Sequence, residues 1–170
     1  MRQSHIEILV LMFVLSLTFG GCKKYEEGPW ISLRSKNARL IGDWKLKEYT
    51  STRYTNNNQG ENTIITTFDG ENITTSGSNT KAYSHQLNLM KGGTYQETIV
   101  YDGDKSEYNG LWTWVDDESK KAQLQYGDRI YTIIKLKNKE LKLSYFWENN
   151  HTVGSNINII SIKREFTFVQ

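Results

Sequence analysis

The chain has 170 residues, with 21 Lys and Arg against 19 Asp and Glu, and a formal net charge of +2. This length is typical of one domain, and the near-neutral charge excludes the strongly basic surface of a nucleic-acid-binding protein. The single Cys excludes intrachain disulfides and any zinc site built on several cysteines. The aromatic content of 12% is too high for a disordered chain.

Residues 8–19 form an almost uninterrupted apolar run, ILVLMFVLSLTF. The run is shorter than the roughly 20 apolar residues that a membrane-spanning helix needs. The alternative, a buried N-terminal helix, is disfavoured because no residue in the run supplies a polar face. Arg2 precedes it and two glycines follow it at 20–21. A basic start, an apolar middle and a small-residue end predict a secretory signal peptide over residues 1–21.

Cys22 follows this segment directly, and residues 17–22 read LTFGGC. The stretch resembles the lipobox of bacterial lipoproteins, although Phe19 stands where that pattern prefers Leu or another aliphatic residue. The resemblance implies that Cys22 is lipidated, with a diacylglyceryl thioether and an amide-linked acyl chain such as palmitate. Several acyl chains anchor far more strongly than one. We therefore expect a protein attached to the outer membrane of a Gram-negative bacterium, facing the periplasm or the cell surface; an unmodified thiol is the alternative.

Residues 22–39 are predicted to be a polar tether with a short helix. The segment 23–27, KKYEE, resembles a sorting signal for surface lipoproteins, and a solvated tether explains it equally well. Residues 32–40 could form one or two helical turns with Ser32 as the N-cap, because Ser accepts hydrogen bonds from the first helical amides. Their apolar positions are sparse, so this helix is short or absent. Residues 1–21 contain one basic and one acidic residue, so the mature chain keeps its +2 charge.

From residue 40 onward, apolar and polar residues alternate with the period of a β-strand. In residues 141–147, for example, every second side chain is Leu, Leu, Tyr or Trp. Turn-forming pairs such as 69–70 (DG) and 92–93 (GG) separate about eight or nine such runs, and no helical pattern lies between them. The fold class predicted is all-β, an antiparallel up-and-down meander closed into a barrel, with a β-sandwich as the alternative. Residues 72–81, NITTSGSNTK, show little strand character and fit either a loop at the barrel mouth or an interruption within a sandwich.

Gly42 and Trp44 open the first predicted strand. They resemble the G-x-W element of lipocalins and lipocalin-like lipoproteins, and a second Gly-x-Trp stands at 110–112. The resemblance implies an eight-stranded barrel over residues 40–170 in which Gly42 permits a tight turn and Trp44 closes one end. It also implies that a basic residue of the last strand, Lys163 or Arg164, stacks on Trp44, a contact of about 0.5–2 kcal/mol.

No pattern predicts catalysis, a metal site or a cofactor, so we expect a protein that is not an enzyme. The histidines His85 and His151 lie far apart and the carboxylates lack ligand spacing. His85 alternates in phase with Tyr83 and Leu87, which favours a hydrogen-bonded interior His. Residues 102–107, DGDKSE, lack the Gly of a calcium loop and are interpreted as a hairpin tip. There is no Gly-x-Ser-x-Gly nucleophile elbow or phosphate-binding loop.

The remaining signal is the set of alternating aromatics, which core packing alone could explain. A small barrel can also enclose one ligand, so we expect a small hydrophobic or amphiphilic molecule and a polar contribution from His85 or Arg129. The candidate ligand-binding residues are His85, Trp112, Trp114, Tyr131, Tyr145 and Trp147. The alternative is a surface interaction module or accessory subunit that grips glycans through exposed Trp112, Trp114 or Trp147. A monomer without nucleic-acid partners is expected in both cases.

Overall fold

The computed structural model describes residues 35–57, 59–115, 122–137, 139–153 and 156–170. The predicted signal peptide, Cys22 and the tether up to residue 34 lie outside these residues. In the described part of the chain one short helix, α2 (Lys36–Leu40), precedes ten strands. The strands are β1 (Gly42–Asn57), β2 (Gly60–Phe68), β3 (Asn72–Thr75), β4 (Lys81–Leu89), β5 (Thr94–Tyr101), β6 (Asp104–Val115), β7 (Gln123–Tyr126), β8 (Arg129–Lys137), β9 (Glu140–Val153) and β10 (Asn156–Val169).

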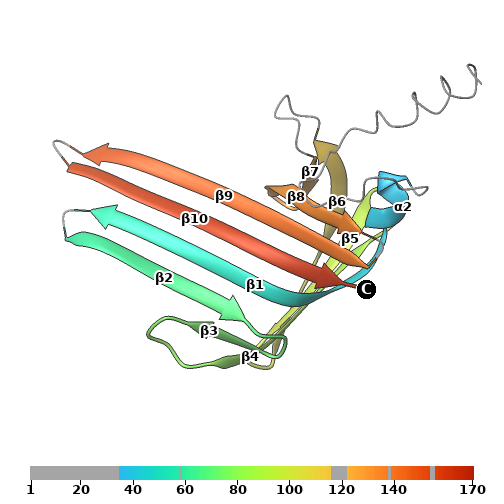
Figure 1. Ribbon diagram of the computed structural model, residues 1–170, viewed down its shortest axis with the longest axis horizontal. Coiled ribbons are helices and arrows are strands. Elements are labelled where there is room, and N and C mark those ends of the chain that lie inside the picture. The colour runs from blue at the N-terminus through green and yellow to red at the C-terminus, as the bar shows by residue number, and fades with distance from the viewer. Residues whose placement is uncertain (1–34, 58, 116–121, 138, 154–155) are drawn as a thin grey trace, which may run out of the picture.

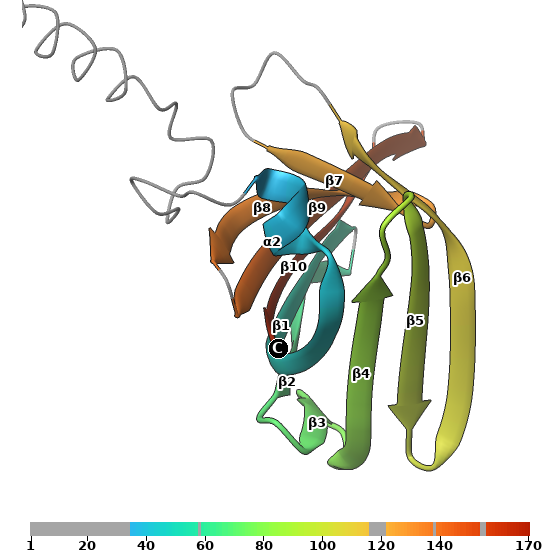
Figure 2. The same ribbon diagram turned by 90° about the vertical axis from the view of Figure 1, so that its right-hand side faces the viewer.

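The strands form one closed antiparallel barrel in the order β1-β10-β9-β8-β7-β6-β5-β4-β3-β2. Figure 2 shows β4, β5 and β6 side by side as one wall of this barrel. The predicted all-β antiparallel barrel is therefore confirmed, and closure of the sheet excludes the sandwich. The strand number is ten because β3 and β7, of four residues each, are separate short strands.

The barrel closes differently at its two ends, because β1 changes partner along its length. Residues 42–45 of β1 pair with β4, whereas residues 49–57 pair with β2. The short strand β3 links β2 to β4 in the half of the barrel farther from α2. The segment 72–81 thus contributes one short strand and a turn, and its weak strand pattern reflects this brief pairing.

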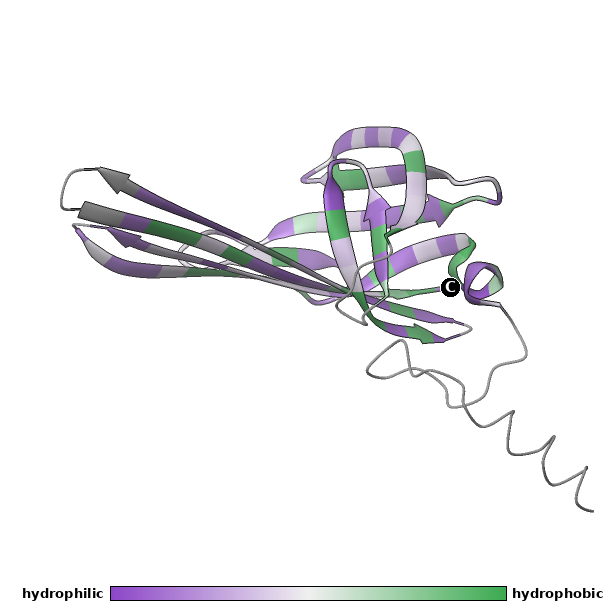
Figure 3. Cartoon of the chain, turned by 90° about the horizontal axis from the view of Figure 1, so that it is seen from above, coloured by the Kyte–Doolittle hydropathy of each residue, from purple (hydrophilic) through white to green (hydrophobic). Residues whose placement is uncertain are grey.

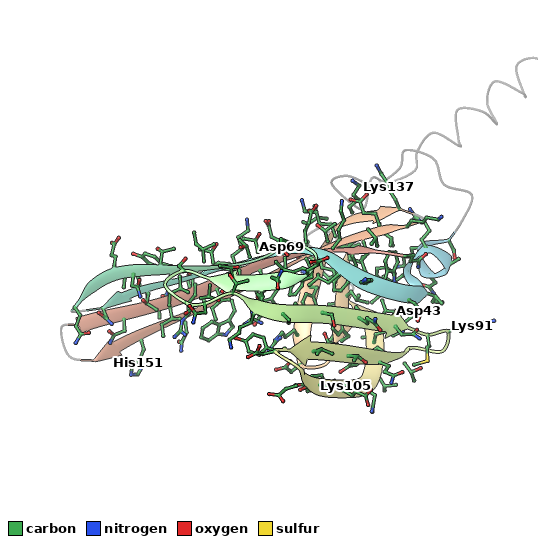
Figure 4. All side chains as sticks on the ribbon, turned by 90° about the horizontal axis from the view of Figure 1, so that it is seen from below. Asp43, Asp69, Lys91, Lys105, Lys137 and His151 are labelled. Carbon is green, nitrogen blue, oxygen red and sulfur yellow. The ribbon has the colours of Figure 1, made fainter. Side chains whose placement is uncertain are left out.

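Four strands continue beyond the barrel body as a flat extension, which we call the arm (residues 53–57, 60–64, 147–153 and 156–162). Figure 1 shows β2, β1, β10 and β9 lying side by side and leaving the barrel away from α2. The β1–β10 register runs from Lys45↔Val169 to Asn56↔Ile159, with one shift between Leu46 and Glu48. In Figure 4, His151 lies near the far end of the arm, opposite Asp43 and Lys91.

The hydrophobic core fills the end of the barrel next to α2. Every second residue of the barrel strands points inward, and Figure 3 shows the resulting alternation of apolar and polar residues. The largest fully buried side chains are Trp44, Phe168, Leu40, Leu87, Leu89, Leu124, Ile133, Leu136, Leu141 and Leu143. Each such side chain contributes about 1.5–3 kcal/mol on burial. Trp44 is 1% exposed, and its indole Nε1–H donates to the Leu40 carbonyl at 2.7 Å.

The N-cap of α2 is Ser35, and the prediction of Ser32 as the cap is wrong. The Ser35 hydroxyl accepts from the Ala38 amide at 3.1 Å, and the helix begins at Lys36. The helix is placed by tertiary contacts, because Arg39 and Leu40 are buried and Arg39 Nη1 donates to the Leu136 carbonyl at 3.1 Å. Sparse apolar residues in the sequence could not show which Ser precedes that buried turn.

Gly42 makes the transition from α2 into β1. Its φ is +149°, a conformation that side chains rarely adopt. A Cβ at this position would also overlap the side-chain amide of Gln170. The backbone conformation therefore favours the Gly of the G-x-W element, whereas the exposed Gln170 side chain could move aside.

Candidate ligand cavity inside the barrel

A partly open cavity of about 540 Å³ lies in the barrel beyond the core, on the side of the arm. Its polar and charged groups are His85, Glu97, Asp128, Arg129 and Arg164. Its aromatic wall consists of Phe166 and six tyrosines, Tyr49, Tyr83, Tyr95, Tyr108, Tyr126 and Tyr131. The cavity is thus aromatic with a few convergent polar groups, the usual composition of a small-molecule site.

Strand alternation explains why these side chains point inward. On β5 the residues Tyr95, Glu97 and Ile99 all line the cavity, as every second residue of a strand should. Gly110 lies opposite Tyr95 in β6. A Cβ at Gly110 would come within 3.0 Å of Tyr95 Cε1. The glycine of the second Gly-x-Trp therefore makes room for a tyrosine ring of the cavity wall.

Stacked aromatic rings form the floor of the cavity. The rings of Tyr126 and Tyr131 are parallel within 9° at 4.5 Å, and Tyr95 meets Tyr126 edge-on at 5.4 Å. Phe166 contacts Tyr131 at 5.9 Å and stacks on Phe168 at 6.0 Å. Each such pair contributes about 0.5–1.5 kcal/mol beyond its buried area. The floor is therefore a packed aromatic layer above the aliphatic core.

The buried hydroxyls of Tyr83, Tyr126 and Tyr131 stay protonated at physiological pH. Burial raises the pKa of Tyr83, Tyr126 and Tyr131 above the ordinary value of 10. For Tyr131, the Tyr126 hydroxyl and the positive charge of Arg129 partly oppose the rise in pKa. Neutral hydroxyls can both donate and accept hydrogen bonds, so this wall can contact a polar group of a ligand.

His85 and Glu97 form a hydrogen-bonded pair on the β4–β5 wall. His85 Nε2 lies 2.7 Å from Glu97 Oε1, and the His85 side chain is 3% exposed. The ring of His85 also packs edge-on against Phe168 at 5.2 Å. The prediction of a hydrogen-bonded interior His is confirmed.

Arg129 and Arg164 lie on the opposite part of the wall and share one aromatic neighbour. The Cζ atoms of both guanidinium groups are 5.8 Å from the centroid of the Tyr145 ring. Arg164 Nε is buried and has no hydrogen-bond partner. Arg129 Nε is 3.6 Å from Asp128 Oδ1, on a side chain that is 88% exposed. The cavity therefore contains two guanidinium groups that protein carboxylates barely neutralise.

The predicted stacking of Arg164 on Trp44 is not formed. In the β1–β10 register Arg164 pairs with Ser51, seven residues along β1 from Trp44. At about 3.3 Å per residue this places the two side chains roughly 20 Å apart along the barrel. Arg164 faces Tyr145 instead, so it belongs to the cavity and not to the closed end.

Two of the six predicted ligand-binding residues, His85 and Tyr131, line the cavity. Tyr145 packs behind Tyr131, with 5.8 Å between ring centroids.

Trp112 and Trp114 lie at the α2 end, where they line a separate open pocket and not the barrel cavity, so their role in ligand binding stays a prediction. Their indole nitrogens donate to the Met90 carbonyl at 3.1 Å and to Asn37 Oδ1 at 2.6 Å. Both Trp side chains are on the inward face of β6. The part of β6 that holds them lies beside α2, beyond the cavity.

Trp147 lies at the base of the arm and is 40% exposed. Its cross-strand partner is Ile162, two residues beyond Arg164 along the outward direction of β10. It does not line the cavity, because the strand continues past the barrel rim. Its role in ligand binding stays a prediction.

Tyr95 and Glu97 are cavity residues that sequence reasoning missed. Their alternation within residues 94–101, TYQETIVY, was a usable signal, but a Glu in a strand suggests a solvent-facing position. Glu97 can lie inside the barrel because it is hydrogen-bonded to His85, which is on another strand. Only the β4–β5 pairing brings the two together.

Among the described residues, no group of three or more His, Cys, Asp or Glu side chains could hold a metal ion. No helix in the same part of the chain has the length and apolar character needed to cross a membrane. No protein-family model, curated protein or solved structure matches the chain.

Proposed function

We propose that this protein binds a small hydrophobic or amphiphilic molecule inside its barrel. The observation that carries the proposal is the cavity of about 540 Å³ with an aromatic wall. Cavities of roughly 300–1,000 Å³ are the usual size for small-molecule sites. An apolar guest would gain about 25 cal/mol for each Å² of its surface removed from water.

The polar groups of the wall favour an amphiphilic guest. The aromatic floor is surrounded by polar groups, namely tyrosine hydroxyls, the His85–Glu97 pair and the two arginines. An apolar part of the ligand would contact the rings, and a polar part would find hydrogen-bond partners. Burying a polar group without such partners costs free energy, so these groups suit a ligand with both characters.

The proposed role is binding and not catalysis. The described residues that line the cavity include no Ser, Thr, Cys or Lys that could act as a nucleophile. The His85–Glu97 pair sits against Phe168, near the floor. The packing of this pair against an aromatic ring supports a structural and ligand-contacting role.

We also propose that the barrel is a lipocalin-like lipoprotein of the outer membrane. The support is the lipobox-like segment at Cys22, the signal-like residues 1–21, and the G-x-W element at Gly42 and Trp44. The antiparallel barrel agrees with this relationship. A ligand carrier held near a lipid surface would have ready access to amphiphiles.

A second candidate function is that of a surface interaction module. It is favoured by the exposed aromatics at the base of the arm, where Phe146 is 64% exposed and Trp147 projects from the other face. Trp112 is buried and Trp114 is half-buried, so the exposed Trp147 is the ring best placed to stack on a glycan. Loss of binding on a glycan array after Trp147→Ala would support this role, and equal signals from both proteins would exclude it.

Fluorescence of phenylnaphthylamine, a neutral apolar dye, tests cavity binding in the full chain. Ile99→Trp fills the cavity, whereas Val100→Trp adds the same ring on the outer face of the same strand. We expect saturable binding that weakens about tenfold or more in Ile99→Trp, a loss of about 1.4 kcal/mol. Val100→Trp should bind like the parent protein. Absence of saturable binding, or equal binding by all three proteins, contradicts the proposal.

A further inference from the structure

The feature that carries an inference beyond amphiphile binding is the pair of guanidinium groups that lie next to the ring of Tyr145. We propose that the ligand of the cavity carries one anionic group, of the carboxylate or sulfonate type, and that Arg164 and Arg129 bind it. This inference rests on the proposed function, because it assigns one end of the molecule that the cavity would hold.

Arg164 is a charge without a protein counter-charge. Its Nε is buried with no hydrogen-bond partner, and its guanidinium lies 5.8 Å from the centroid of the Tyr145 ring. Among the described residues it forms no ion pair. A partly buried cation is costly unless it is paired, and the cation–π contact satisfies none of its N–H donors. An anion from outside the chain would satisfy them.

Arg129 supplies a second charge near the same point. Its nearest carboxylate, Asp128, is separated by 3.6 Å and is almost fully solvated. Exposed pairs of this kind contribute little, so the guanidinium is still able to bind another anion. Arginine binds carboxylates and related anions with two parallel N–H donors. Two such groups around one ring form a suitable anion site.

The Glu97 carboxylate inside the cavity does not neutralise either arginine. Glu97 is hydrogen-bonded to His85 at 2.7 Å on the β4–β5 wall. No ion pair links Glu97 to either arginine among the described residues. Its negative charge also disfavours an anion close to the β4–β5 wall, which directs the anionic end of a ligand toward the arginines.

The position of the arginines predicts how the ligand lies. Arg164 is two residues farther from the core than Phe166 on β10, and Arg129 follows the exposed turn at Gly127 and Asp128. The aromatic floor lies deeper, against Phe168. An amphiphile would therefore enter with its apolar part first and leave its anionic group at the level of the two arginines.

Two dyes with one shared ring system test the inference on the full chain. Anilinonaphthalene sulfonate carries an anionic group, and phenylnaphthylamine lacks it. The variants are Arg164→Gln and Arg129→Gln, which remove each charge with little change in size. The control is Lys163→Gln, next to Arg164 but on the outer face, where Lys163 forms only an exposed ion pair with Glu165. Circular dichroism and thermal unfolding check that each variant is folded.

We expect Arg164→Gln to lower the affinity for the sulfonate dye by about tenfold to a hundredfold. This is the range for losing a hydrogen bond to a charged group. Arg129→Gln should also lower the affinity for the sulfonate dye. In both variants the affinity for the neutral dye should change by less than about twofold. Lys163→Gln should change the affinity for neither dye. If one arginine variant does not fold, the other still decides the question.

Two results separate failure of the inference from failure of the proposed function. If the neutral dye binds in the cavity but the arginine variants bind the sulfonate dye as tightly as the parent protein, the anion site is wrong and the ligand cavity stands. If neither dye binds saturably, the proposed function fails, and the anion site fails with it. Octanoate and octanol as competitors extend the test to carboxylates, and equal displacement of the sulfonate dye by both would also overturn the inference.

Discussion

His85 Nε2 and Glu97 Oε1 lie 2.7 Å apart within the barrel, joining β4 to β5 through two polar side chains. The two residues are not direct cross-strand partners, since His85 pairs with Ile99 and Glu97 with Leu87. The bond therefore runs diagonally across the strand pair on the inner face. It allows a polar His and an acidic residue to occupy an interior that is otherwise aromatic.

Removing the Glu97 carboxylate should destabilise the barrel. Glu97→Leu leaves His85 Nε2 buried without its partner, so we expect a loss of about 1–3 kcal/mol in the free energy of unfolding. Glu97→Gln keeps a hydrogen-bonding group and should cost less. Urea denaturation measures both. The control Glu107→Leu removes an exposed carboxylate of β6 and should change stability by less than about 0.5 kcal/mol; a similar loss in Glu97→Leu and Glu107→Leu would argue against a structural pair.

Trp44→Ala should destabilise the protein severely. The side chain is buried at the α2 end, and its Nε1–H donates to the Leu40 carbonyl. Truncation of such a ring leaves a cavity, with an expected loss of about 3–5 kcal/mol. Trp147→Ala, at the exposed base of the arm, should cost less than about 1 kcal/mol. Denaturant unfolding compares the two, and a loss below about 1 kcal/mol for Trp44→Ala would show that this ring does not hold the barrel end together.

Stability should fall as the pH rises above about 10, the ordinary pKa of tyrosine. Burial raises the pKa of Tyr83 and Tyr126 in the folded protein. Above pH 10 the unfolded chain therefore binds fewer protons than the folded one, and the free energy of unfolding decreases with pH. These tyrosines contribute their full stabilisation below this pH.

Alkaline titration of tyrosinate absorbance, together with urea unfolding at several pH values, measures this effect. Tyr83→Phe removes one of the late-titrating hydroxyls and should flatten the decline in stability. A parent protein whose tyrosines all titrate near pH 10 while it stays folded would contradict the expectation.

Cys22→Ala tests the proposed lipid anchor. If Cys22 is the lipidated residue, the variant should leave the membrane fraction, because a polar barrel without acyl chains has no comparable affinity for lipid. Treatment of the parent protein with globomycin, which blocks lipoprotein processing, should leave an uncleaved precursor. A Cys22→Ala protein that still fractionates with membranes would show that the anchor lies elsewhere.

Much of the fold was accessible from sequence, whereas the candidate site was only partly so. Alternation placed Tyr83, His85 and Leu87 on one face of β4, and the structure has Tyr83 and His85 in the cavity wall. The same alternation gave Trp112 the inward phase of β6, but it could not show that this end of β6 lies beside α2. The face of a strand on which a side chain lies follows from the local sequence. Its position along the barrel axis depends on how that strand pairs with its neighbours.

The sequence by itself determined the all-β class and the antiparallel order of strands, because alternation and turn residues act within a few positions of the chain. It also indicated which side chains face inward. Only the tertiary structure decided that Arg164 lies beside Tyr145 and not beneath Trp44, and that Glu97 has a buried partner. Those relationships depend on the hydrogen-bond register between strands far apart in sequence, which no local pattern encodes.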